Sequence, residues 1–457
     1  MQSHNSLQMK VLVVGNGARE NAIVEAFSRS KHNLEIVVFA DKVNPGIKKF
    51  ASAYEVASSL LDFEKLREFA AKEKPEFAVV GPEAPIVAGA ADELEKLGIP
   101  CVAPKKLGGQ LEGSKAFTRK LMQKYEIVGN PAFAVFKKWS GDISEADVME
   151  AMRKFVEALN GEFVVKADGL QGGKGVKVVG DHLAGIADGL HYAKRCIEED
   201  GYVVIEEKLI GEEFSLMYLT DGETLAAMPA VQDHKRAYED DKGPNTGGMG
   251  TYSDSNHSLP FLTAEDLVQA REITQAMLEA VNEETGEKFR GVMYGGFMAT
   301  KAGVRLIEYN ARFGDPEAEN VFPIMESDFV DVCRAVISGN LKNTPLEFAK
   351  KATVCKYVVP NGYPDAPIKG EEIKVFGLPE NCKAYYASVD LDSEGRLRLG
   401  GSRAIALVGI ADSLSKAERI AEEGVKSIEG PVFHRRDIGT EALINRRVIH
   451  MQNIRKQ

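Results

Sequence analysis

Hydrophobic positions in the first hundred residues follow two alternating periods. Short runs rich in β-branched residues, KVLVV, EIVVFA and EFAVV, are separated by segments such as ARENAIVEAFSRS and FEKLREFAAKEK, where apolar residues recur every three or four positions. The first pattern predicts buried strands and the second predicts amphipathic helices. Because strands that alternate with helices pair in parallel, residues 9–111 are predicted to form an α/β domain with helices on both faces of its sheet.

The pattern changes beyond residue 111. A helix is predicted over EGSKAFTRKLMQKYE, and then a small unit with strands at AFAVF, FVVKAD and VKVV, the last two joined by a glycine-rich turn. Longer strands are predicted at YVVIEEKL, EEFSLMYL, GVMYGGFMAT and GVRLIEYN, and the short turns between neighbours predict antiparallel pairs. We expect a second domain over residues 112–345, with a small lid subdomain over residues 127–198.

The remaining residues, 346–457, combine short strands with one clear helix. The strands are predicted at TVCKYVV, AYYASV and AIALVGI, and the helix at SLSKAERIAEEGVKSI. By the same layer argument, this segment is predicted to be a small α+β domain.

Composition narrows the class of protein. The 457 residues carry a formal net charge of -11, which repels nucleic acid at long range. Five widely spaced cysteines without a C-x-x-C pair favour a reducing compartment over a disulfide framework or a zinc site. No apolar run approaches the ~20 residues of a membrane helix, and residues 1–8 lack the apolar core of a signal peptide, so a cytoplasmic protein is expected.

The segment VVGNGARE (residues 13–20) follows a strand and opens a helix, a place where free backbone amides suit an anion. It is not a complete G-x-G-x-x-G motif, because Glu20 occupies the third glycine position. Dinucleotide binding is therefore disfavoured, and a tight turn between strand and helix is the alternative.

The segment KADGLQGGKGVKVV (residues 166–179) resembles a phosphate loop but fails the P-loop pattern at Asp168 and Val176. A mobile hairpin that brings Lys166 and Lys174 over phosphates is one interpretation, and an exposed polar hairpin is the other. In the next strand, Glu206 and Glu207 face opposite ways, so at most one is expected to point into a pocket.

The segment IEYNARFGDPEAE (residues 307–319) gives the most specific signal from the residues alone. Strand alternation places Glu308 and Asn310 on one face, and their side chains offer two oxygen ligands for a hard cation. Arg312 and Asp315 follow in a turn, where the guanidinium could grip a carboxylate or phosphate. The alternative is a solvent-facing strand edge with a polar turn.

Together these motifs resemble the ATP-grasp superfamily and, more closely, the phosphoribosylamine-glycine ligase family of purine biosynthesis. The similarity also covers VVGPEAPIVAG, GSKAFTRKLM, VIEEKLIGEEFS, QDHKRAYEDDKGPNTGGMGTY and FHRRDIGTEAL, and thus nearly the whole chain in order. It implies an N-terminal parallel α/β domain, an ATP-grasp fold of two subdomains and a small C-terminal α+β domain. It also implies an ATP-dependent ligase that joins glycine to 5-phosphoribosylamine through a glycyl phosphate.

The resemblance assigns a role to each matching residue. Glu308 and Asn310 would hold magnesium or manganese, and Arg312, Lys235 and Asp233 would act at the reacting groups. ATP would be bound by Lys115, Lys166, Lys174, Glu206, Glu207, Leu209 and Glu213. The other substrates would be bound by Gly17, Arg19, Glu20, Gly81, Pro82, Glu83, Asn245, Thr246, Gly247, Gly248 and Asp315.

The sequence departs from the family pattern at three points, and three alternative functions stay open. Asn21 stands where the family often has histidine, while Gln171 with Gly172 and Ala311 replace other usual residues. The rivals are a related ligase for a different amino acid or amine, a catalytically silent nucleotide-binding regulator, and a nicotinamide dehydrogenase. The expected partners are glycine and 5-phosphoribosylamine, without nucleic acid or membrane, in a monomer or loose homodimer.

Overall fold

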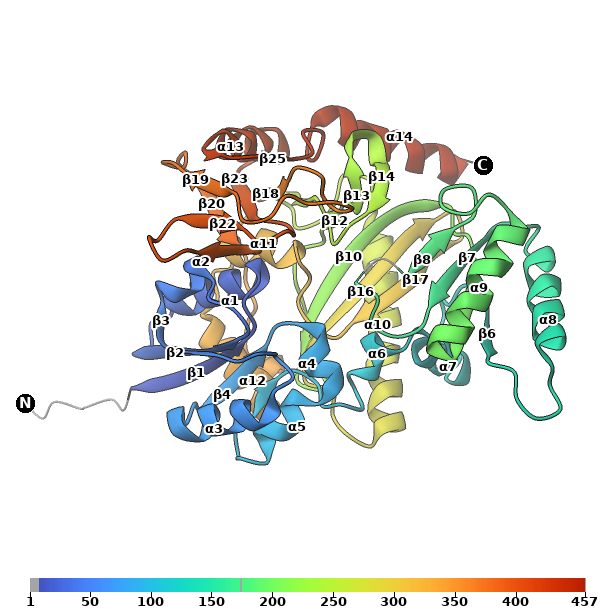
Figure 1. Ribbon diagram of the computed structural model, residues 1–457, viewed down its shortest axis with the longest axis horizontal. Coiled ribbons are helices and arrows are strands. Elements are labelled where there is room, and N and C mark those ends of the chain that lie inside the picture. The colour runs from blue at the N-terminus through green and yellow to red at the C-terminus, as the bar shows by residue number, and fades with distance from the viewer. Residues whose placement is uncertain (1–7, 173–174, 457) are drawn as a thin grey trace, which may run out of the picture.

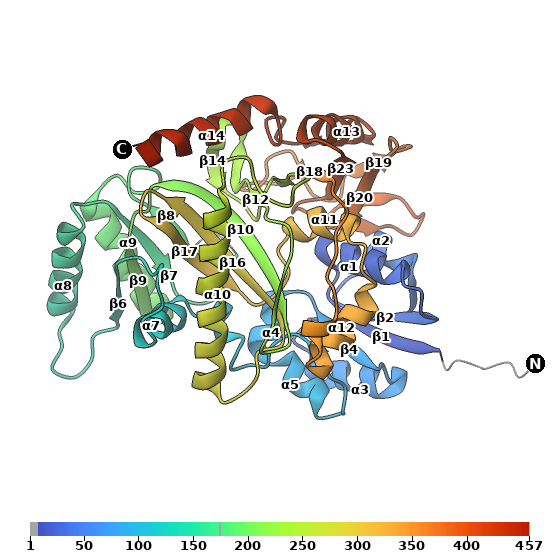
Figure 2. The same cartoon turned by 180° about the vertical axis from the view of Figure 1, so that it is seen from behind.

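The computed structural model describes residues 8–172 and 175–456, and Figures 1 and 2 show it from opposite sides. Within that part of the chain, no helix is both long enough and apolar enough to cross a membrane. Lys174, a predicted ATP-binding residue, lies outside the described residues.

The N-terminal segment forms a parallel five-stranded sheet in the order β3-β2-β1-β4-β5. This confirms the predicted parallel α/β architecture, because KVLVV, EIVVFA and EFAVV are neighbouring strands with buried side chains. The strands are β1 (Met9–Val14), β2 (Leu34–Ala40), β3 (Ala51–Val56), β4 (Phe77–Val80) and β5 (Cys101–Val102). The helices are α1 (Ala18–Ser28), α2 (Pro45–Lys48), α3 (Phe63–Glu73), α4 (Glu83–Ala88) and α5 (Ala90–Glu95).

Two further antiparallel sheets follow, and α6 (Gln110–Gly113) and α7 (Lys115–Lys124) lead from the N-terminal sheet to the first of them. The lid sheet has the order β6-β9-β7-β8 and its own hydrophobic core, formed with two helices. Its elements are β6 (Phe133–Lys137), α8 (Glu145–Ala158), β7 (Phe163–Ala167), β8 (Val176–Val178), α9 (Ile186–Asp200) and β9 (Tyr202–Glu207). The central sheet has the order β11-β10-β16-β17. Its elements are β10 (Gly211–Thr220), β11 (Leu225–Ala227), α10 (Ala264–Thr285), β16 (Gly291–Thr300) and β17 (Gly303–Asn310).

One predicted strand pair is wrong. YVVIEEKL and EEFSLMYL do not pair with each other, because β9 lies in the lid sheet and β10 in the central sheet. Both edges of β9 are occupied by β6 and β7, which leaves no edge free for β10. The short link after β9 therefore passes from one sheet to the other, whereas GVMYGGFMAT and GVRLIEYN do form the predicted antiparallel pair.

The C-terminal part combines strands with α13 (Leu414–Lys426), and α14 (Glu441–Lys456) crosses the top of the molecule in Figure 1. One sheet follows the order β12-β15-β18-β23-β20, with β25 also paired to β18, and the other follows β21-β22-β19-β24. The strands are β18 (Ala352–Pro360), β19 (Glu372–Val375), β20 (Cys382–Tyr386), β21 (Val389–Leu391), β22 (Leu397–Leu399), β23 (Ile405–Ala411), β24 (Ile428–Glu429) and β25 (Val432–Phe433).

Two parts of the middle segment pack outside the lid and central sheets. The stretch before α10 contributes β12 and β15 to the C-terminal sheet, and the stretch after β17 packs against α1 of the N-terminal unit. The first consists of β12 (Gln232–Asp233), β13 (Arg236–Tyr238), η1 (Glu239–Asp241), β14 (Lys242–Asn245) and β15 (Gly250–Ser253). The second consists of α11 (Glu317–Val321), η2 (Phe322–Ile324), α12 (Phe329–Ser338) and η3 (Leu341–Asn343).

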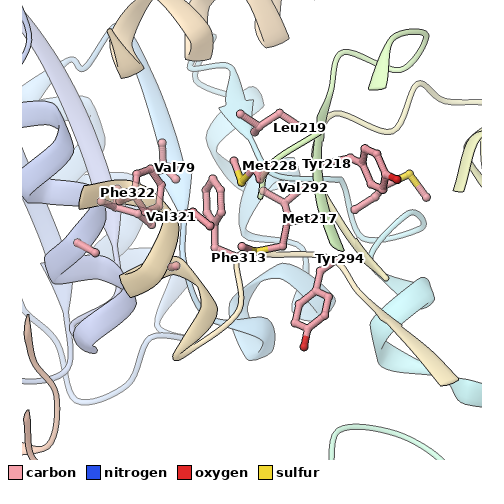
Figure 3. Packing of buried hydrophobic residues seen from close by; sticks show 14 of the residues in the cluster. Val79, Met217, Tyr218, Leu219, Met228, Val292, Tyr294, Phe313, Val321 and Phe322 are labelled. Atoms are coloured by element: carbon pink, nitrogen blue, oxygen red, sulfur yellow. The ribbon is translucent and has the colours of Figure 1, made fainter. Parts of the chain in front are cut away.

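The N-terminal unit and the central sheet share one hydrophobic core. Figure 3 shows Phe322 and Val321 beside Val79 of β4, while Phe313 extends toward Met217 of β10. The rings of Phe313 and Phe322 lie 5.0 Å apart. The turn after β17 is therefore anchored on both sides by buried apolar contacts, which fixes the polar residues within it.

Candidate active site

A cavity of about 440 Å³ opens where the N-terminal unit, the lid, the central sheet and the C-terminal unit meet. It brings together most of the residues singled out from the sequence. Those lining it are Gly17, Arg19, Glu20, Pro82, Glu83, Lys115, Glu206, Asp233, Lys235, Thr246, Gly247, Glu308, Asn310, Arg312 and Asp315.

The cation-ligand candidates lie together on β17. Glu308 is paired with Gly296 of the neighbouring strand β16. Burial alone would raise the pKa of Glu308, but the charges of Lys235, Lys115 and other cations outweigh it and lower that pKa to about 2. An ionised carboxylate beside an amide oxygen is a donor set that fits a hard divalent cation.

Arg312 follows β17 and is held between two carboxylates. Its Nη2 lies 3.0 Å from Oε1 of Glu112, and its Nε lies 3.7 Å from Oε2 of Glu83. Glu112 also accepts the backbone N–H of Ala311 at 2.8 Å, which fixes the turn. The buried Nε of Arg312 has no hydrogen-bond partner among the described residues, so this guanidinium keeps a free donor beside the cavity.

Glu206, the first of the two adjacent strand glutamates, belongs to a buried ionic cluster. Its carboxylate accepts from Arg119 Nε at 2.5 Å and from Arg119 Nη2 at 2.9 Å, and lies 2.7 Å from Lys166 Nζ. Burial would raise the pKa of Glu206, but Arg119 and Lys166 lower it. Glu207 faces away from the cavity and accepts the backbone N–H of Ala132 at 2.8 Å.

The glycine-rich turn of the lid is attached to the first turn of α7. Asp168 accepts from the hydroxyl of Ser114 at 2.9 Å and from the backbone N–H of Ala116 at 3.1 Å. Lys115 donates to the carbonyl of Gly169 at 3.0 Å. Asp168, one of the two residues that break the P-loop pattern, thus bonds the N-terminus of a helix, where a carboxylate is favoured.

In the N-terminal unit, the side chain of Glu20 folds back over its own turn. It accepts the backbone N–H of Gly17 at 2.5 Å and the Nε of Arg19 at 2.6 Å. A Cβ at Gly81 would lie 2.0 Å from the Glu20 carboxylate, so only glycine fits there. The amide of Gly17, the residue directly before α1, is therefore already bonded to a carboxylate of the protein and is not free for an anion. Arg19 also donates to the carbonyl of Phe313 at 3.1 Å.

The loop between β14 and β15 is organised from two sides. The Thr246 hydroxyl donates to the Lys235 carbonyl at 2.9 Å and accepts the N–H of Gly248 at 3.0 Å. Arg403, from the C-terminal unit, donates through Nη1 to the carbonyls of Gly247 and Gly248 at 2.8 and 3.1 Å. Its Nη2 lies 3.1 Å from the carboxylate of Asp315. One C-terminal side chain therefore holds two loops that line the cavity.

Some predicted residues lie elsewhere. Six of them do not line this cavity: Gly81, Lys166, Glu207, Leu209, Asn245 and Gly248. Glu213 instead borders a small neighbouring pocket with Asp233, Lys235 and Glu308. Asn21 also lies outside it and accepts the backbone N–H of Tyr386 at 2.9 Å. Sequence analysis did not single out several polar lining residues, among them Glu112, Arg119, Tyr294, Glu317 and Arg403. Glu112 and Glu317 lie within or beside quoted motifs, whereas Arg403 has no local signal.

Family models match the chain in three consecutive segments. The N domain of phosphoribosylglycinamide synthetase matches residues 9–112, its ATP-grasp domain residues 113–318, and its C domain residues 353–441. Relatives described as phosphoribosylamine-glycine ligase include a Methanosarcina acetivorans protein, 46% identical over 98% of both chains. Another, from Methanocaldococcus jannaschii, is 46% identical over 98% of this chain and 100% of its own length.

Solved structures point the same way. The phosphoribosylamine-glycine ligase of Thermotoga maritima aligns with a TM-score of 0.75 and 28% identity, covering 94% of this chain and 100% of that protein. The biotin carboxylase domain of Hydrogenobacter thermophilus 2-oxoglutarate carboxylase aligns with a TM-score of 0.69 at 16% identity, over 97% of this chain and 93% of that one. The second likeness concerns the fold alone.

Proposed function

The chain belongs to the phosphoribosylglycinamide synthetase family, and on that premise we propose that it is an ATP-dependent ligase that joins glycine to 5-phosphoribosylamine. The products are glycinamide ribonucleotide, ADP and phosphate, a step of purine biosynthesis. The observation that carries the proposal is the full-length match combined with one cavity that collects residues from every unit of the fold.

ATP is proposed to lie between the lid sheet and the central sheet. Lys115 and the Gly169–Gly172 turn border the cavity on the lid side, and Glu308 and Asn310 border it on the central sheet. Lys166, Glu207, Leu209 and Glu213 remain proposed ATP contacts, as does Lys174, which lies outside the described residues. Because the lid has a hydrophobic core of its own, it can close over ATP as a unit about the link after β9.

Glu308 and Asn310 are proposed to hold magnesium or manganese. A divalent cation bound there would neutralise charge on the phosphates during transfer. Lys235, whose Nζ lies 3.6 Å from Glu308 Oε1, would place a second positive charge beside the transferred phosphoryl group. Burial opposes the charged form of Lys235, but Glu308 and Glu213 raise its pKa, so it stays protonated at neutral pH.

The proposed chemistry has two displacements. A carboxylate oxygen of glycine attacks the γ-phosphorus of ATP, and the bond to the β-phosphate oxygen breaks to give glycyl phosphate and ADP. The neutral amine of phosphoribosylamine then attacks the acyl carbon, phosphate leaves, and the nitrogen loses a proton. Arg312, with a free donor beside the cavity, is proposed to stabilise the negative charge, so positioning and electrostatics carry the catalysis.

Phosphoribosylamine is proposed to contact residues of the N-terminal unit: Gly17, Arg19, Glu20, Gly81, Pro82 and Glu83. The other side of its site is proposed to be formed by Asp315, Asn245, Thr246, Gly247 and Gly248. The protein is proposed to act in the cytoplasm as a monomer or loose homodimer, without nucleic acid or membrane.

The test is phosphate release from ATP with magnesium, adding glycine and freshly prepared phosphoribosylamine separately and together. We expect full turnover and the amide product only when both are present. Turnover with another amino acid but not with glycine would keep the ATP-grasp chemistry and overturn the substrate assignment. Absence of turnover with any amino acid and amine pair would overturn the ligase itself.

A further inference from the structure

The segment FHRRDIG (residues 433–439) carries part of the sequence resemblance, yet the proposed function assigns it no role. All seven residues belong to the described part of the chain, and none of them lines the cavity. The segment connects β25 to α14. Its backbone is fixed by Lys356 of β18, whose side chain is fully buried and donates to the carbonyl of Arg436 at 2.8 Å. FHRRDIG is therefore attached firmly to the C-terminal sheet.

Within this segment, Arg435 has a fully buried guanidinium that bonds in two directions. Toward its own segment, Nε and Nη2 donate to the carboxylate of Asp437 at 2.9 and 2.7 Å. Toward the hairpin of β13 and β14, Nη1 donates to the carboxylate of Asp241 at 3.0 Å and to the carbonyl of Arg236 at 3.1 Å. One planar group thus joins the C-terminal unit to the tip and to the first strand of the hairpin.

The tip of this hairpin has a backbone conformation that needs support from outside. Asp240 and Asp241 have φ values of 59° and 54°, in the left-handed region that residues with a side chain seldom adopt. Asp241 is bonded by Arg435 and also by Arg447 of α14, while the N–H of Asp240 donates to Asp437 at 3.1 Å. Strained backbone persists where surrounding contacts determine it, and it is concentrated at functional sites. These contacts indicate a hairpin whose position is specified.

The other end of the hairpin lies at the cavity. Lys235 directly precedes β13, Thr246 directly follows β14, and both residues line the cavity. The N–H of Thr246 donates to the carbonyl of Lys235 at 2.7 Å, and the Thr246 hydroxyl donates to the same carbonyl at 2.9 Å. Because these bonds close the base of the hairpin, a shift of the hairpin would displace both residues. It would also separate Lys235 from Glu308, whose Oε1 lies 3.6 Å from the lysine Nζ.

Resting on the proposed function, we propose that Arg435 is a positioning residue for the ligase reaction and that Asp241 is its partner in that role. Arg435 lies outside the cavity and acts through the hairpin. The hairpin in turn determines where Lys235 and Thr246 lie beside the phosphoryl group that is transferred. The C-terminal unit thus contributes to catalysis without touching the substrates. A displacement of about 1 Å at a group that acts in the transition state can lower a rate about 100-fold.

The experiment uses the full-length protein with Arg435→Lys and Asp241→Asn. Lysine keeps the charge but lacks the planar fork, so it cannot make all the bonds of Arg435 at once. Asparagine removes one charge from the hairpin and still tolerates a positive φ. With saturating substrates, kcat should fall by about 10- to 100-fold in each variant. The KM for ATP should stay within about twofold of wild type, because the lost interaction acts in the transition state.

The matched control is Asp240→Asn. Asp240 is the neighbouring residue of the tip and shares the left-handed backbone, but its ion pair with Arg446 is more than half exposed on both sides. Because an exposed pair contributes little, this variant should keep the wild-type kcat. The double variant of Arg435→Lys with Asp241→Asn should be no slower than the slower single variant, since both changes remove the same contact.

A role in folding alone would lower kcat by reducing the share of folded protein. Calorimetric titration with magnesium and a non-hydrolysable ATP analogue measures the number of binding sites per chain, and we expect the wild-type number in each variant. A fall in that number that matches the fall in kcat would overturn the positioning role. Wild-type kcat in both single variants, an equal loss in Asp240→Asn, or multiplied losses in the double variant would also overturn it.

If Arg435→Lys fails to fold by circular dichroism, the comparison of Asp241→Asn with Asp240→Asn decides, because both changes lie at the hairpin tip. Failure of the proposed function is distinguishable from failure of the positioning role. In the first case the wild-type protein makes no amide from glycine, whereas in the second the wild type is active and the variants are equally active.

Discussion

The buried cluster of Arg119, Glu206 and Lys166 gives a prediction whose magnitude follows from its contacts. Replacing Glu206 with glutamine removes the single negative charge that both cations share. The side chains of Arg119 and Lys166 are only 2% and 5% exposed, so water cannot replace that charge effectively. Arg119 keeps the carbonyls of Leu306 and Ile307 at 3.0 and 2.8 Å, and Lys166 keeps the Ile307 carbonyl at 2.8 Å. Because those acceptors survive, we expect the lower end of the usual cost of breaking a buried ion pair, about 3 kcal/mol.

At 2–4 °C per kcal/mol for a unit of 150–250 residues, this cost corresponds to a fall in Tm of about 6–12 °C. The assay is thermal unfolding followed by circular dichroism, together with the KM for ATP, which should rise because Lys166 loses one of the two acceptors that position it. The control is Glu207→Gln: this neighbouring side chain accepts the N–H of Ala132, and a glutamine oxygen can replace it. Equal melting of the two variants would refute the reasoning, because adjacent residues would then contribute alike despite their different environments.

Three further predictions concern the metal, the C-terminal unit and pH. Glu308→Gln should raise the metal concentration needed for half-maximal activity by about 10- to 100-fold or more, with an unchanged circular dichroism spectrum, and wild-type metal dependence would remove Glu308 from the metal site. Arg403→Lys should lower kcat/KM about tenfold, since lysine lacks the planar fork that spans both loops, and unaltered kinetics would show that the loops hold themselves. Burial and the charge of Arg435 lower the pKa of His234 from 6.5 to about 3. Between these pH values His234 binds a proton in the unfolded chain but not in the folded one, so the free energy of unfolding falls as pH drops from 6.5 toward 3. The slope approaches about 1.4 kcal/mol per pH unit, and urea titrations of His234→Gln should lack this contribution, so parallel pH profiles would contradict it.

The elements that sequence predicted correctly are those whose pattern is local. The strands of the N-terminal sheet are continuous apolar runs, and α3 carries its apolar residues on one face, so each element could be predicted without its neighbours. Pairing is not local in this way. The short link between β9 and β10 predicted a hairpin. In the structure β9 pairs instead with β6 and β7, two strands that precede it by dozens of residues.

The same distinction applies to the site. Glu308 and Asn310 could be predicted as neighbours because strand alternation alone puts them on one face. Arg403 could not, since it reaches Gly247 and Asp315 across 156 and 88 residues of chain. Arg403 lies near these loops because β12 and β15 are strands of the C-terminal sheet, and no local pattern in the sequence predicts that pairing.

The charge of the cavity explains how a chain of net charge -11 can bind anionic substrates. Among the described residues, eight carboxylates and six arginine or lysine side chains line the cavity, so its lining carries no excess of positive charge. Carboxylates hold Arg312 and Lys235 in place before any substrate arrives, which offsets the cost of burying those cations. Phosphates and carboxylates of the substrates must then share these cations with the protein's own carboxylates. Binding of the anions therefore favours simultaneous uptake of compensating positive charge, which a divalent metal at Glu308 would supply. A dependence of ATP affinity on the concentration of this cation is the direct consequence of such linked charges.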